Sequence, residues 1–128
     1  MKKTLALVLA VVLVLVTALP VFAAEPRWAN IVSIVPRLLL ADDMYISEIV
    51  GMDGTTKITC QMILYERDVY GDYNEVDRST KQTVYAPDAL FQKDYDLNSG
   101  TSYRLVTNVD VTRNGTTESV SYTFDKRL

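Results

Sequence analysis

Hydrophobic and polar residues alternate with a period of two along most of the chain from residue 28 onward, and no stretch there has the spacing of an amphipathic helix. Residues 57–67 and 102–113 show the alternation most clearly. Because successive side chains of a strand point to opposite faces of a sheet, every second residue is predicted to face a core. These inward positions are Ile58, Cys60, Met62 and Leu64 in the first segment, and Tyr103, Leu105, Thr107, Val109 and Val111 in the second.

Turn residues divide the chain into short runs at a spacing of about 8 to 12 residues, which is typical of all-β sandwiches and barrels. The predicted strands cover residues 28–40, 44–52, 57–67, 75–85, 90–97, 102–113 and 117–124. Asn114-Gly115 is the strongest hairpin signal, because both central residues of a type I′ turn need a positive φ. Pro36 predicts an edge, a bulge or a kink in the first run. The mostly polar fourth run predicts an edge or solvent-facing strand.

About seven antiparallel strands in a chain of this length predict an all-β fold, an immunoglobulin-like sandwich, with a small barrel as the alternative. The full length of 128 residues fits one such domain.

The first 23 residues have the pattern of a secretory signal peptide. Met1-Lys2-Lys3 is basic, residues 4–19 are almost wholly apolar, and Pro20 precedes the small-residue site at Ala23. We therefore expect cleavage after Ala23, which leaves residues 24–128 as a secreted single domain with no membrane contact. An uncleaved membrane anchor is the alternative, since about 20 apolar residues can just span a bilayer. Whether the domain is then retained at the cell surface stays open.

The charge balance argues against nucleic acid as a partner. The chain carries 13 basic and 16 acidic residues, a net charge of −3. Loss of Lys2 and Lys3 with the signal peptide leaves 11 basic residues and a net charge of −5. An acidic domain lacks the electrostatic footprint that nucleic acids or anionic lipids require.

The inventory of reactive side chains argues against an enzyme. The chain contains no histidine, so Ser-His-Asp and Cys-His sites cannot form. The single cysteine, Cys60, falls on an inward strand position, where a thiol is inert; a disulfide between two chains is the alternative. The acidic residues near Asp72 do not have the spacing of a calcium loop. We expect no catalytic residue, no metal and no cofactor.

Residues 97–103, Leu97-Asn98-Ser99-Gly100-Thr101-Ser102-Tyr103, resemble the tyrosine-corner segment of fibronectin type III domains. The resemblance implies a sandwich in which the Tyr103 hydroxyl hydrogen-bonds a nearby backbone group. The whole layout is similar to small secreted sandwich domains of Gram-positive bacteria. It departs from the fibronectin type III pattern in the position of its tryptophan. Those domains usually bury a tryptophan on the second strand, whereas here Trp28 lies on the first predicted strand and residues 44–52 contain none.

The best candidates for ligand contact are Tyr70 and Tyr73 in the predicted hairpin, together with Trp28. Tyrosine and tryptophan offer rigid, amphipathic contact area. The alternatives are that Tyr70 and Tyr73 form a cross-strand pair that stabilises the hairpin, and that Trp28 covers one end of the core. The sequence thus predicts a secreted, non-catalytic binding module for an extracellular protein or glycan. The alternative function is a structural or assembly component of the cell surface or of an extracellular complex.

Overall fold

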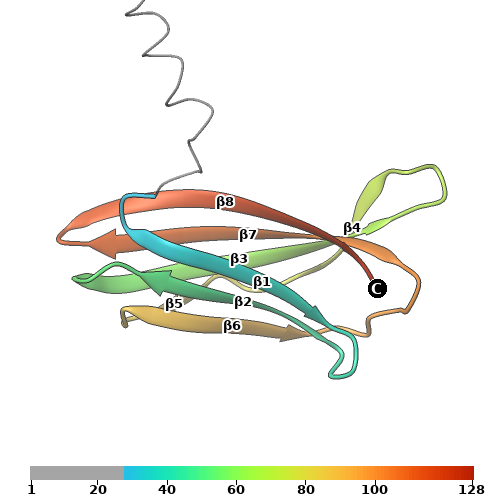
Figure 1. The fold of residues 1–128 in the computed structure, drawn as a ribbon, viewed down its shortest axis with the longest axis horizontal. Helices are drawn as coiled ribbons and strands as arrows, with labels where there is room; N and C mark the ends of the chain where they lie inside the picture. The colour runs from blue at the N-terminus through green and yellow to red at the C-terminus, as the bar shows by residue number, and fades with distance from the viewer. Residues whose placement is uncertain (1–27) are drawn as a thin grey trace, which may run out of the picture.

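Eight β-strands build the part of the chain that the computed structural model describes, residues 28–128 (Figure 1). The signal peptide predicted for residues 1–23 lies outside these residues. The strands are β1 (Ile31–Leu39), β2 (Met44–Gly51), β3 (Thr55–Arg67), β4 (Tyr73–Arg78), β5 (Gln82–Val84), β6 (Asp88–Asp94), β7 (Ser102–Arg113) and β8 (Thr116–Arg127). No helix in residues 28–128 is long and apolar enough to cross a membrane.

The strands form two antiparallel sheets that pack face to face as a β-sandwich. The first sheet has the order β1-β2-β6. The second has the order β4-β3-β7-β8, and β5 pairs with β3 beside β4. The predicted all-β sandwich is therefore confirmed, with eight strands in place of about seven.

The extra strand comes from a break in the fourth predicted run. Ser79 interrupts the run and bonds the main chain of β3: its N–H donates to the Met62 carbonyl oxygen at 2.9 Å, and its hydroxyl oxygen accepts the Met62 N–H at 2.8 Å. The edge position predicted for this run is confirmed, as β4 and β5. The first strand begins later than predicted, at Ile31, and continues through Pro36. It is the edge strand β1, so the edge position that Pro36 predicted is confirmed.

The core lies between the sheets and includes the predicted inward residues of β3 and β7, all of which are buried. The facing sheet contributes Ile31, Ile34, Leu38, Tyr45, Ile49 and Phe91. Thr59 and Ile63 were predicted to face outward and are also buried, each at 8% exposure. Ile63 sits on the outer face between Arg78 of β4 and Val106 of β7. In the interior of this five-stranded sheet, such flanking side chains shield a residue from water even on the solvent side.

Two polar contacts join the sheets, one inside the core and one that is partly exposed. Ser47 of β2 and Thr107 of β7 are both fully buried, and their hydroxyl oxygens lie 2.7 Å apart. Asp77 of β4 accepts hydrogen bonds from the Tyr45 hydroxyl at 2.9 Å and from the Lys93 amine at 2.9 and 3.2 Å. Burial raises the pKa of the Asp77 carboxyl, but the bonds from Lys93 and Tyr45 outweigh it, so the net pKa lies below its usual value.

Two features that the sequence predicted for the two ends of β7 are present. The hydroxyl oxygen of the fully buried Tyr103 accepts the Asn98 N–H at 2.9 Å, as the resemblance implied. Asn114 and Gly115 have φ angles of 50° and 77°, as a type I′ turn requires. The hairpin fixes the register of β7 on β8 along its whole length, from Arg113 opposite Thr116 to Ser102 opposite Arg127.

Candidate binding site

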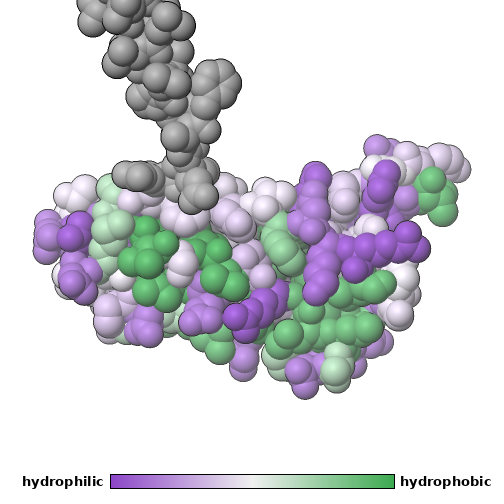
Figure 2. Space-filling view, in the orientation of Figure 1, coloured by the Kyte–Doolittle hydropathy of each residue, from purple (hydrophilic) through white to green (hydrophobic). Residues whose placement is uncertain are grey.

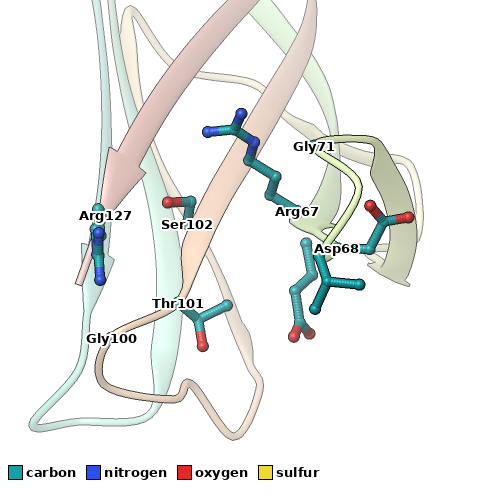
Figure 3. Close-up of a pocket in the computed structure, with 9 residues that line it drawn as sticks. Arg67, Asp68, Gly71, Gly100, Thr101, Ser102 and Arg127 are labelled. Atoms are coloured by element: carbon teal, nitrogen blue, oxygen red, sulfur yellow. The ribbon is translucent and has the colours of Figure 1, made fainter.

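The strand register gathers Arg67, Ser102 and Arg127 at one end of the sandwich. Glu66 of β3 pairs with Tyr103 of β7, which places Arg67 beside Ser102, and Ser102 pairs with Arg127 of β8. A hollow of about 330 Å³ lies at this end, between the β3–β4 loop and the segment that precedes β7 (Figure 3). Its lining is polar and includes the following residues: Glu66, Arg67, Asp68, Val69, Gly71, Gly100, Thr101, Ser102 and Arg127.

The hollow is lined by both basic and acidic side chains, and its two arginines form no ion pair within residues 28–128. Within residues 28–128, neither Arg67 nor Arg127 has a carboxylate partner at ion-pair distance. Glu66 and Asp68 supply negative charge to the same lining. In Figure 3 the Asp68 carboxylate points toward its own loop and away from both guanidinium groups. The hollow therefore offers free hydrogen-bond donors from two arginines beside the hydroxyls of Thr101 and Ser102.

The Arg104–Asp125 pair lies on β7 and β8 two residues from the Ser102–Arg127 pair and contacts the start of β4. Arg104 of β7 donates two hydrogen bonds to Asp125 of β8, at 2.7 and 2.9 Å, and its guanidinium carbon lies 4.1 Å from the centroid of the Tyr73 ring. The hydrogen bonds from Arg104 hold the pKa of the Asp125 carboxyl below its usual value. Tyr73 is thus half-buried beneath an arginine, and its strand partner is Arg67. The Tyr70–Tyr73 cross-strand pair, given above as the alternative, does not form, because Tyr70 lies in the loop and Tyr73 pairs with Arg67.

The loop between β3 and β4 is ordered by one carboxylate. Asp68 accepts hydrogen bonds from the N–H groups of Tyr70 and Asp72, at 2.9 and 3.0 Å, and from the Asn74 side-chain amide at 2.9 Å. The bond from Asn74 is the main cause of the lowered pKa of Asp68. Tyr70 is 87% exposed at the tip of this ordered loop, next to Val69 at 93%. The loop therefore presents an aromatic and an aliphatic side chain to solvent on a hydrogen-bonded frame.

Trp28, the third predicted contact residue, lies elsewhere. It packs edge-on against Tyr122, with ring centroids 6.0 Å apart and an angle of 73° between the rings. Both residues pack against the hydrophobic core, while the hollow lies at the Arg127 end of β8. The structure brings Tyr70 and Tyr73 to the hollow's end of the sandwich and leaves Trp28 away from it.

Arg67, Ser102 and Arg127 were missed by the sequence analysis. One of their pairings could have been predicted from the sequence. A two-residue turn at Asn114-Gly115 pairs Arg113 with Thr116, and counting away from the turn along both strands places Ser102 opposite Arg127. The approach of Arg67 depends on how β3 pairs with β7, a long-range register that no local turn specifies.

The described residues contain little else that could carry chemistry. Cys60 is 2% exposed, and burial raises the pKa of its thiol to about 12. A disulfide between chains would therefore require the core to open. No group of three or more Cys, Asp or Glu side chains in residues 28–128 is arranged to hold a metal ion.

The chain has no match among protein-family models, and no curated protein is significantly similar to it. The fold and the geometry of the hollow are therefore the basis on which its function is proposed.

Proposed function

We propose that this protein is a secreted, non-catalytic binding module, and that its ligand is an extracellular glycan bound at the hollow between the β3–β4 loop and β7. The observation that carries the proposal is the pair of arginines, Arg67 and Arg127, that have no carboxylate partner among residues 28–128 and lie beside the hydroxyls of Thr101 and Ser102. The site is open and polar and lies at one end of the β4-β3-β7-β8 sheet.

The chemistry of the lining complements a sugar. Sugar hydroxyls both donate and accept hydrogen bonds, and the hollow supplies arginine donors, the Glu66 acceptor and two hydroxyls. Tyr70, exposed at the loop tip, adds an aromatic face on which a sugar ring can stack. A carboxylate or sulfate on the sugar would form charge-assisted bonds with Arg67 and Arg127, which are stronger than neutral ones.

The test is binding to immobilised polysaccharides, one uronic-acid polymer, one sulfated polymer and one neutral polymer, with Arg67→Gln, Arg127→Gln and Tyr70→Ala. Each arginine change should weaken binding by roughly tenfold or more, because a hydrogen bond to a charged group contributes about 1.5–3 kcal/mol. The matched control is Arg37→Gln, an exposed arginine on β1 of the other sheet. Equal losses in all four variants, or no binding to any polymer, would contradict the proposal.

We propose further that residues 1–23 direct export and that the domain is a fibronectin type III-like sandwich of a Gram-positive bacterium. The strand order β1-β2-β6 and β4-β3-β7-β8 and the Tyr103–Asn98 hydrogen bond support the fold assignment. Expression of the full chain in an exporting host, followed by intact-mass measurement of the medium, tests the export. A species that begins at Ala24 is the expected result, and retention of the uncleaved chain in membranes would contradict it.

A second candidate function, assembly with other subunits, is favoured by the outer face of the β1-β2-β6 sheet. Figure 2 shows apolar patches on this side of the molecule. Val32 of β1 and Leu90 of β6 are 59% and 56% exposed, and Leu40 in the turn that follows β1 is 38% exposed. Leu90→Lys should dissociate any assembly that buries this face, and a measurement of the molecular mass in solution would detect the change.

A further inference from the structure

β8 is a long strand with one unpaired edge. It spans 12 residues, and within residues 28–128 its strand partner is β7 alone. The Arg113–Thr116 pair closes the two-residue hairpin, and Leu128 N–H donates to the Thr101 carbonyl oxygen at the other end. Because backbone groups alternate in direction, the even-numbered residues bond β7 and the odd-numbered residues from Thr117 to Arg127 direct their N–H and C=O groups outward.

The inner face of β8 is less covered than that of its neighbour. Every inward residue of β7 from Tyr103 to Val111 is buried, whereas Val120, Tyr122 and Phe124 of β8 are only partly buried. These three side chains pack against the hydrophobic core, and Trp28 packs edge-on against Tyr122. A strand added at this edge would cover them and satisfy the outward backbone groups at the same time.

We propose that a second copy of this chain occupies the edge, and that the two β8 strands pair antiparallel about Tyr122. This register places Glu118 opposite Lys126 of the second copy on the inner face. The other cross-strand pairs in this register are Val120–Phe124 on the inner face, and Ser121–Thr123, Ser119–Asp125 and Thr117–Arg127 on the outer face. Each of these pairs forms twice, because the two-fold axis passes through Tyr122.

The charge pattern selects this register over its neighbours. Centring the pairing on Ser121 places Glu118 opposite Phe124, and centring it on Thr123 places Lys126 opposite Val120. Opposite charges that face each other across strands stabilise a sheet, and a charge facing an apolar side chain does not. The N–H groups of Ala29 and Asn30 hold the Glu118 carboxylate by hydrogen bonds of 2.7 and 3.0 Å, so the acceptor for Lys126 is already positioned.

Charge variants at the exposed residues Ser121 and Thr123 test the interface directly. In the proposed pairing, Ser121 of one copy faces Thr123 of the other. Ser121→Lys/Thr123→Lys would place like charges opposite each other twice per dimer and should raise the dissociation constant about tenfold. Ser121→Lys/Thr123→Glu changes the same two positions but makes each opposed pair attractive, and should retain the dimer.

The measurement is sedimentation velocity of the full chain, in the form in which an exporting host yields it, across the micromolar range. Circular dichroism confirms that each variant is folded. The expected result is a dimer for the unmodified protein and the Lys/Glu variant, and a monomer for the Lys/Lys variant at the same concentration. A monomeric unmodified protein would overturn the proposal, as would a dimer that Leu90→Lys dissociates and Ser121→Lys/Thr123→Lys does not. None of the substituted positions lines the hollow, so these variants leave its lining unchanged and a loss of the dimer is distinguishable from a loss of glycan binding.

Discussion

The hydrogen bond between Ser47 and Thr107 permits a quantitative test of how the two sheets are held together. Both side chains have no exposed surface, and each hydroxyl is the other's partner across the core. Ser47→Ala leaves the Thr107 hydroxyl buried without that partner, and Thr107→Val does the same to Ser47. Each single change should lower the free energy of unfolding by about 1–3 kcal/mol, the cost of a buried unpaired polar group. At this domain size, a loss of 1 kcal/mol corresponds to a decrease in Tm of roughly 4–8 °C.

The double variant Ser47→Ala/Thr107→Val removes both hydroxyls at once. Because no polar group is then left unpaired, the double variant should lose much less unfolding free energy than the two single variants lose in sum. The difference is the coupling energy, which we expect to be about 1–3 kcal/mol. Urea unfolding followed by the fluorescence of Trp28, the single tryptophan, measures all four proteins. The control cycle uses Thr112 and Thr117, whose hydroxyls bond at 2.8 Å on the exposed surface, where water replaces a lost partner. Additive losses in the buried cycle, or equal coupling in both cycles, would refute the reasoning.

Three further predictions concern stability. Tyr103→Phe should lower the free energy of unfolding by about 1 kcal/mol or more, because it leaves the Asn98 N–H without its hydroxyl acceptor; urea unfolding measures this loss. The folded pKa of Asp77 is depressed, so its contribution to stability is present above the unfolded value of about 3.9 and is lost as pH falls through the folded value. The Tm of Asp77→Asn should therefore be below that of the unmodified protein at neutral pH, and the two should converge as pH falls below about 4; a constant difference would contradict this. Gly51→Ala should lower Tm, because an added Cβ would overlap the Thr55 hydroxyl oxygen and lie 2.7 Å from the Thr55 Cβ; an unchanged Tm would show that Thr55 moves aside freely.

The sequence predicted the fold well where local patterns determine it. Strict alternation identified the inner faces of β3 and β7, and Asn114-Gly115 placed the hairpin that sets the register of β8. The break at Ser79 was not predicted, because a serine that bonds a neighbouring strand through both its N–H and its hydroxyl leaves no periodic signal. Trp28 was expected at a ligand or at the end of the core, and its contact with Tyr122 depends on packing between segments 94 residues apart.

The candidate site was predicted only in part for the same physical reason. Local turn signals identified the loop that carries Tyr70, and its exposure in the structure follows from its place at the loop tip. Tyr73 was expected to be available to a ligand, but the approach of Arg104 from β7 covers its ring. Such contacts arise from long-range strand pairing, which the residues of either strand do not specify alone.

The break at Ser79 gives the two edges of the second sheet different capacities for growth. On the β3 side, two short strands of six and three residues are offset from each other and cannot template one continuous new strand. On the other side, β8 offers 12 uninterrupted residues. Association through this sheet can therefore extend in one direction only, and a symmetric partner at β8 leaves no second long edge of the same sheet, within residues 28–128, for a third chain. The same interruption that adds a strand to the fold thus favours closed pairs of molecules over open-ended fibres.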